Sequence, residues 1–95
     1  MATQIITAVP DEITAAGTEN TELILPAKYQ AQTGLSLNLV AKLTITSGGP
    51  IRFALGVDAS NSNFYVVDNI NITLLGNENI NFKANAQGDK FTIEI

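Results

Sequence analysis

Hydrophobic and polar residues alternate along most of this 95-residue chain. The longest alternation covers residues 35–45, where leucine, alanine and isoleucine hold the odd positions and mostly polar residues hold the even ones. A period of two turns one set of side chains toward a core and the other toward water, as in a strand with one buried face. A helix would need apolar residues three and four positions apart. The pattern therefore predicts a strand over residues 35–45.

Four further segments, 51–57, 70–74, 80–86 and 91–95, show the same alternation. The segments between them are rich in Gly, Asn, Asp, Ser and Pro, which favour turns. Short strands about ten residues apart are typical of antiparallel all-β domains. We therefore predict an all-β fold, either an antiparallel β-sandwich or a jelly-roll-like barrel. The repeat of Asn69-Ile70-Asn71-Ile72 in Asn79-Ile80-Asn81-Phe82 also fits the rungs of a β-helix, and a meander of hairpins explains it at least as well.

The first third of the chain has a less regular pattern. Segments 3–9 and 21–25 could form strands, but Pro10 and Pro26 interrupt them. We predict an extended N-terminal arm over residues 1–20 and a β-sandwich domain over residues 21–95. Three apolar residues of the arm, Ile5, Ile6 and Val9, have no obvious place in a compact sandwich, so we expect them to lie on another molecule. An edge strand of the chain's own sheet is the alternative.

Composition excludes several functional classes. The chain has no cysteine and no histidine, which removes thiol chemistry and the side chain best suited to proton transfer near neutral pH. Its net charge of −4 argues against nucleic acid as a partner, because phosphate binding requires a basic surface. No window approaches the roughly 20 apolar residues of a membrane span, and no basic residue precedes the first apolar pair, so we expect no membrane association and no secretion leader.

The polar segment from Asp58 to Asn63 has two interpretations. Asp58, Asn61 and Asp68 offer oxygen ligands for a loose calcium site, although the spacing of an EF-hand is absent. Asp, Asn and Ser also cap turns by hydrogen bonds from side chain to backbone. We interpret the segment as a structural turn and predict no metal and no cofactor.

Catalysis is not expected from this chain. Its nine acidic residues lie mostly in or beside predicted turns, and so short a chain offers no obvious cleft. Sugar binding in β-sandwiches usually relies on exposed aromatic side chains, and here tryptophan is absent and only Tyr29 and Tyr65 have a polar tip. A glycan-binding or receptor-binding module is therefore the alternative function, favoured if these two tyrosines lie together beside a groove.

Apolar residues on faces expected to be wet favour an interaction surface. Val40, Val67 and Leu75 occupy such positions, and charged residues make up only 15% of the chain. Depletion of charge is the compositional mark of interface cores. We predict a homo-oligomer, a dimer or trimer, or docking through one sheet face. The candidate interface residues are Ile5, Ile6, Val9, Val40, Tyr65, Val67 and Leu75.

The short Met-Ala-Thr opening, the polar first segment, the turn-punctuated body "IRFALGVDASNSNFYVVDNINITLLG" and the ending "GDKFTIEI" resemble the small virion proteins of tailed bacteriophages. Capsid decoration or cement proteins are the nearest type. The resemblance implies a non-enzymatic structural protein, assembled in a host cytoplasm into the virion, that binds the major capsid protein or another virion protein and reinforces the particle. The alternative within the same class is a receptor-binding or glycan-binding β module of a tail or tail fibre.

Overall fold

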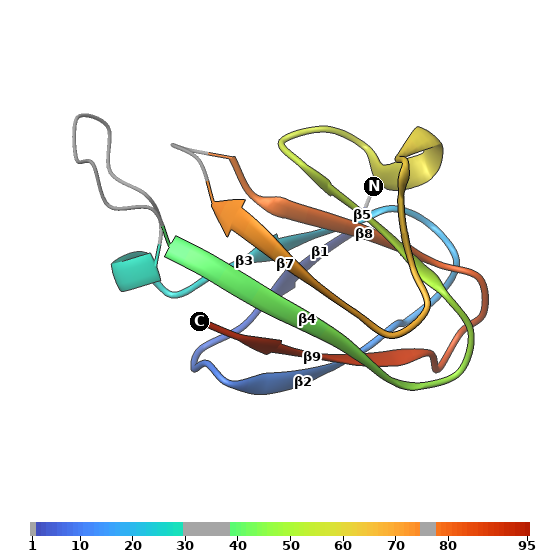
Figure 1. The fold of residues 1–95 in the computed structure, drawn as a ribbon, viewed down its shortest axis with the longest axis horizontal. Coiled ribbons are helices and arrows are strands. Elements are labelled where there is room, and N and C mark those ends of the chain that lie inside the picture. Colours follow the sequence, from blue (N-terminus) through green and yellow to red (C-terminus); the bar gives the residue numbers. More distant parts are fainter. Residues whose placement is uncertain (1, 30–38, 75–77) are drawn as a thin grey trace.

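The computed structural model describes residues 2–29, 39–74 and 78–95, which form two β-sheets packed face to face (Figure 1). One sheet has five strands in the order β1-β3-β8-β5-β6, and the other has four in the order β2-β9-β4-β7. All described strand pairs are antiparallel except β1 with β3. The predicted all-β antiparallel sandwich is confirmed. The strands are β1 (Ala2–Ile5), β2 (Asp11–Thr14), β3 (Thr21–Ile24), β4 (Leu39–Ser47), β5 (Ile51–Leu55), β6 (Phe64–Val66), β7 (Asn69–Leu74), β8 (Ile80–Ala84) and β9 (Lys90–Glu94).

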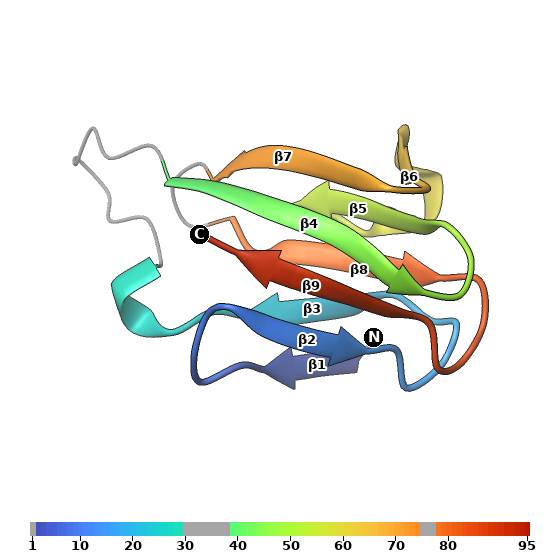
Figure 2. The same ribbon diagram turned by 60° about the horizontal axis from the view of Figure 1, so that its bottom comes forward.

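The chain passes repeatedly from one sheet to the other. Among the described strands, β5 and β6 are the only consecutive pair that shares a sheet. The edge strands β6 and β7 form one side of the sandwich, and the edge strands β1 and β2 form the opposite side (Figure 2). Helical structure in the described ranges consists of two single 3-10 turns, η1 (Ala27–Tyr29) and η2 (Ala59–Asn61), and no helix there is long and apolar enough to cross a membrane.

Strand β4 shows how the alternation produces the sandwich. Ala41 and Leu43 are fully buried between the sheets, whereas Val40 and Lys42 are exposed on the outer face. This is the predicted assignment of faces, although β4 continues to Ser47 and residues 35–38 lie outside the described ranges. Strand register is strongly specified here, because a shift by one residue would expose the leucine and bury the lysine.

The core is centred on three phenylalanines that join the two sheets. Phe53 and Phe82 come from neighbouring strands of the five-stranded sheet, and both meet Phe91 of the other sheet edge to face, with ring centroids 5.0 Å and 4.9 Å away. All three are almost completely buried. Such aromatic pairs contribute about 0.5–1.5 kcal/mol each beyond the area that they bury.

Between residues 2 and 20 the chain forms two strands that pair within the sandwich. β1 pairs with β3, and β2 pairs with β9, which places the two strands at the edges of different sheets. The segment also supplies Ile6, Ile13 and Ala15 to the hydrophobic core. The edge-strand alternative therefore describes residues 2–5 and 11–14. Hydrophobic burial explains why these strands pack in the sandwich. Removing Ile6 and Ile13 from water gains free energy only if β1 and β2 join the two sheets.

A buried carboxylate holds two turns together at one end of the sandwich. Asp89, in the turn between β8 and β9, accepts hydrogen bonds from the backbone N–H of Gly49 (3.4 Å) and of Ala86 (3.2 Å). Gly48 precedes Gly49 in the turn between β4 and β5 and has a φ of +88°. A Cβ atom on Gly48 would lie 2.0 Å from Asp89 Oδ1, so this close approach requires glycine.

Candidate functional site

The segment from Asp58 to Asn63 forms a well-defined turn beside β5. η2 begins after Asp58, whose Oδ1 accepts a hydrogen bond from Ser60 N at 2.7 Å, and it ends where Ser62 N donates to Ala59 O at 3.1 Å. The interpretation as a hydrogen-bonded turn is confirmed. The hydrogen bonds from Ser60 are the main reason that the pKa of Asp58 lies below its ordinary value, and the positive charge of Lys83 adds to this effect.

Two buried asparagines anchor the turn to the sandwich. Asn20 Oδ1 accepts a hydrogen bond from Ala59 N at 2.8 Å, and Asn20 Nδ2 donates to Asn81 Oδ1 at 3.0 Å. Asn81 Nδ2 in turn donates to Asn79 O at 3.2 Å. Sequence reasoning assigned Asn81 to a wet face, because it occupies a polar position of an alternating strand. The turn covers this position, and the contact between Asn20 and Ala59 spans 39 residues, so no local pattern indicates it.

Basic and hydroxyl side chains fasten the rest of the turn. Arg52 Nη1 donates to the carbonyl oxygens of Ser60 and Ser62, both at 3.4 Å, and its guanidinium lies 4.9 Å from the ring centroid of Tyr65. Lys83 Nζ donates to Ser60 Oγ at 3.4 Å. Ser62 Oγ donates to Phe53 O. The turn is thus fastened by side-chain hydrogen bonds to β5 and β8, and it forms one wall beside the end of β5.

A groove with a volume of about 630 Å³ lies between this turn and β7. Its size is within the range of small-ligand pockets, about 300–1,000 Å³. Ala54 and Leu55 of β5 and Ile72 of β7 contribute apolar surface from the two sheets, and Val57 and Phe64 also line the groove. The groove therefore opens on the side of the sandwich formed by β6 and β7.

Unpaired polar groups surround the apolar surface of the groove. Asn61, Asn63, Asn71 and Thr73 are among the residues that line the groove; they are exposed, and their side chains have no hydrogen-bond partner among the described residues. Asp58 is the one charged residue among those that line it. The described part of the chain holds no group of three acidic residues placed to bind a metal ion, and Asp58 uses one carboxylate oxygen to cap the turn.

Exposed apolar side chains gather beside the groove. We call Val57, Phe64, Tyr65 and Val67 the apolar strip. Val57 and Phe64 line the groove, whereas Tyr65, the next residue of β6, points to the opposite face of its sheet, where it pairs with Arg52. Their exposed fractions are 64%, 56%, 47% and 71%. Of these residues, sequence reasoning singled out Tyr65 and Val67 but missed Val57 and Phe64. It placed Val57 on the core face of a strand, whereas β5 ends at Leu55 and Gly56, with a φ of +69°, turns the chain outward.

The other predicted interface residues are dispersed. Val40 is exposed on the outer face of β4, where it pairs with Thr73 of β7, and Ile5 is exposed on β1 at the opposite side of the sandwich. Ile6 is only 3% exposed and packs in the core between the sheets, so it is not part of the exposed surface of this chain. Val9 is half-buried against the same core, and Leu75 lies outside the described residues.

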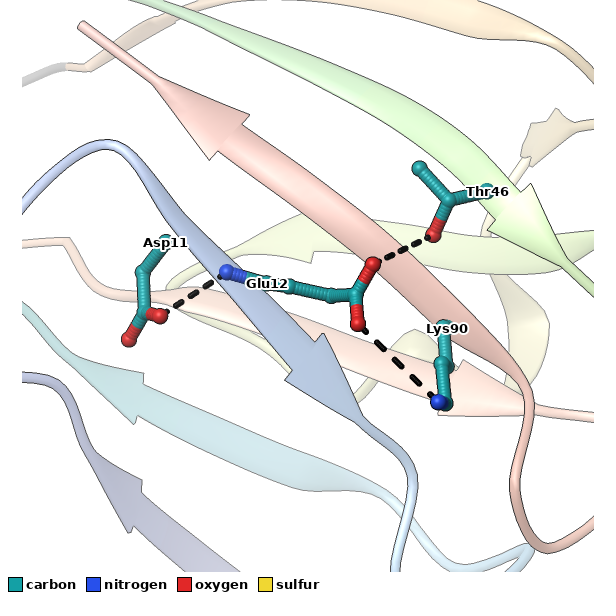
Figure 3. A network of polar contacts seen from close by, with 4 residues as sticks. All are labelled: Asp11, Glu12, Thr46 and Lys90. Carbon is teal, nitrogen blue, oxygen red and sulfur yellow. Dashed lines mark hydrogen bonds and ion pairs between the residues drawn. The ribbon is translucent and has the colours of Figure 1, made fainter.

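Asp11 and Glu12 of β2 belong to a network of polar contacts with Thr46 and Lys90 (Figure 3), and β2 is at the edge of the four-stranded sheet opposite to β7. Glu12 accepts a hydrogen bond from Thr46 Oγ1 at 3.4 Å and faces Lys90 Nζ at 4.0 Å, while Asp11 Oδ1 accepts from Glu12 N at 2.8 Å. These side chains are largely solvated, and an exposed ion pair of this kind contributes about 0–1 kcal/mol. We assign this network to the surface of the sheet.

Comparison with known proteins found no matching family model, no matching curated protein and no matching solved structure. The functional argument therefore depends on the geometry of the groove and the apolar strip.

Proposed function

We propose that this protein is a non-enzymatic structural protein of a virion, and that it docks on the particle's protein lattice through the side of the sandwich formed by β6 and β7. The observation that carries the proposal is the apolar strip. Val57 and Phe64 line the same groove, and large exposed apolar side chains that lie together on a small soluble domain often mark an interaction site. The two aromatic residues of the strip add weight, because aromatic side chains are enriched in interfaces.

The charge distribution supports the same side of the molecule. Glu12 and Lys90 lie on the outer face of the four-stranded sheet toward β2, and Lys42 and Glu94 pair across β4 and β9 of that face. The strip residues themselves are uncharged, and the Arg52 guanidinium lies 4.9 Å from the ring centroid of Tyr65. Removing a charge from water is costly, so an uncharged side chain is easier to bury against a partner than a charged one. The proposal that the protein is part of a virion rests on the sequence resemblance. The proposal that it docks or self-associates rests on the apolar strip.

Glycan binding has less support as the function. The sequence argument for it required Tyr29 and Tyr65 to lie together beside a groove. Tyr29 packs half-buried against the core at the end of η1, after β3, whereas Tyr65 lies on β6 and is separated from β3 by two strands of the same sheet. No paired aromatic platform exists among the described residues.

Co-sedimentation with tailed-phage particles prepared without this protein tests the proposal. The wild-type protein is expected to sediment with the particles, and Phe64→Asp and Val67→Asp are expected to stay in the supernatant. Thr3→Asp is the matched control, because it adds the same charge to an exposed position of β1 on the opposite side. Equal sedimentation of all four proteins, or loss only in Thr3→Asp, would contradict docking through the apolar strip.

A further inference from the structure

The groove exposes unpaired backbone groups of β7. Ile45 N of β4 donates to Asp68 O at 2.8 Å, and β7 continues antiparallel to β4 from this contact. In an antiparallel strand the backbone N–H and C=O of one residue point to one side, and those of the next residue point to the other. The N–H and C=O of Ile70 and Ile72 therefore face β4, and those of Asn71 and Thr73 face away from it. β7 is the edge strand of its sheet, and both Asn71 and Thr73 line the groove.

The opposite wall of the groove also includes a free strand edge. Gly56 N donates to Asn79 O at 2.9 Å on the side of β8, so the peptide group of Leu55 points to the other side, toward β6. Pairing between β5 and β6 ends at Phe53 and Phe64. Leu55 therefore lies beyond the end of the β6 ladder, and it lines the groove.

The charge of the groove indicates the charge of its occupant. Asp58 is the one charged group among the described lining residues, and Ser60 N occupies only one of its oxygens. The neighbouring cations, Arg52 and Lys83, donate their hydrogen bonds to Ser60 and Ser62, so the charge of Lys83 acts on Asp58 only from a distance. A positively charged side chain in the groove would therefore complement Asp58, whereas an acidic one would be repelled.

We propose that the groove binds an extended segment of a partner protein, with alternating apolar residues and at least one lysine or arginine, which adds as a strand along the free edge of β7. The proposal rests on the docking function and names the site and the chemistry of the partner. The outward peptide groups of Asn71 and Thr73 bind the backbone of the segment, its apolar side chains contact Leu55 and Ile72, and its cation binds Asp58. In strand addition the backbone hydrogen bonds supply affinity, and the pockets for alternate side chains supply specificity.

Nuclear magnetic resonance with synthetic peptides tests the site. The probe is a peptide of about six residues with alternating valine and lysine, long enough to follow β7 at about 3.3 Å per residue. We expect it to shift the amide signals of Leu55, Asn71 and Thr73 and to slow hydrogen exchange at Asn71 and Thr73. The same peptide with N-methylated backbone on its β7-facing residues is expected not to bind. Glutamate in place of lysine is expected to weaken binding at least about tenfold, through loss of a charge-assisted contact.

Two protein variants separate strand addition from simple apolar contact. Thr73→Pro removes an N–H that faces the free edge and keeps the ladder with β4, a position where edge strands tolerate proline. Asp58→Asn keeps a good N-cap residue and removes the charge. We expect Thr73→Pro to abolish peptide binding and Asp58→Asn to weaken it about tenfold for the lysine peptide. The matched control is Asp68→Asn, which makes the same chemical change at an exposed residue outside the groove lining, and its affinity should equal that of the wild type.

Several results would overturn the proposal. These are no signal change at millimolar peptide, equal binding of the N-methylated peptide, unchanged affinity in Thr73→Pro, or perturbation of the groove by neutral oligosaccharides and not by peptide. The docking function is judged separately on particles. If Thr73→Pro still sediments with particles while Phe64→Asp does not, docking stands and strand addition fails. If both variants sediment as the wild type does, the docking function itself fails.

Discussion

Asn20 Nδ2 donates a hydrogen bond of 3.0 Å to Asn81 Oδ1, and this buried pair joins the residue before β3 to the second residue of β8. The same Asn20 side chain receives the N–H of Ala59. One asparagine therefore links the two strands to the turn that forms a wall of the groove, and its contacts connect the stability of the fold with the shape of the site.

Replacing Asn20 by alanine should destabilise the protein because it leaves Ala59 N and Asn81 Oδ1 buried without a partner. A buried polar group without its partner costs about 1–3 kcal/mol, so we expect a loss in that range or above it in urea unfolding. Asn69→Ala makes the same chemical change at an exposed position and should stay within about 0.5 kcal/mol of the wild type. Equal losses in the two variants would show that the anchor has no energetic role.

Gly48 should tolerate alanine less well than the other turn glycines. Gly48→Ala combines a positive φ with a Cβ atom 2.0 Å from Asp89 Oδ1, whereas Gly88→Ala has a φ of +91° and open space around the added atom. Gly88→Ala should therefore lower the free energy of unfolding by about 1–2 kcal/mol, the usual cost of an L-residue in the left-handed conformation. Gly48→Ala should lower it clearly more. Gly49→Ala has neither problem and should be close to neutral. Thermal unfolding of the three variants measures the order, and a Gly88→Ala loss equal to that of Gly48→Ala would show that the contact with Asp89 costs nothing.

The register of β4 can be checked with two neighbouring residues. Leu43→Ala removes a fully buried side chain and should cost about 2–5 kcal/mol of unfolding free energy, whereas Lys42→Ala removes an exposed one and should cost less than about 0.5 kcal/mol. Chemical denaturation gives both values. Similar losses would contradict the assignment of faces, because adjacent residues of a strand point in opposite directions.

Asp58 should make stability depend on pH in acid. Its pKa in the folded protein is lowered, chiefly by hydrogen bonds from Ser60, so the folded state binds this proton less readily than the unfolded chain does. The contribution is fully present above the unfolded pKa, near about pH 4, and is lost as the pH falls through the folded value. The difference in unfolding free energy between wild type and Asp58→Asn should therefore be constant above about pH 5 and shrink below about pH 4. A difference that grows on acidification would contradict the capping role.

Alternation alone was sufficient to predict the strands that have one buried face. In β4 and β9 the buried residues Leu43, Phe91 and Ile93 occupy the positions that the period of two assigns to the core. The end of β5 was placed two residues too late, because the alternation continues through Val57 while the positive φ of Gly56 already turns the chain.

The N-terminal strands and the groove were harder to predict from sequence. β1 and β2 contain four residues each, too few for a clear period, and their partners are distant in the chain. The turn at Asp58 was predictable because its capping chemistry is local. The hydrogen bond between Asn20 and this turn could not be predicted, nor could the place of Asn71 in the opposite wall of the groove. Both depend on how the two sheets are placed in space.

Electron cryomicroscopy of virions that contain this protein tests the central claim most directly, because it shows which side of the sandwich meets the lattice. We expect Phe64, Tyr65 and Val67 to be covered by a neighbouring protein, with β1 and β2 on the side away from that contact. A virion in which these three residues face solvent while β1 or β2 contacts the lattice would contradict the account.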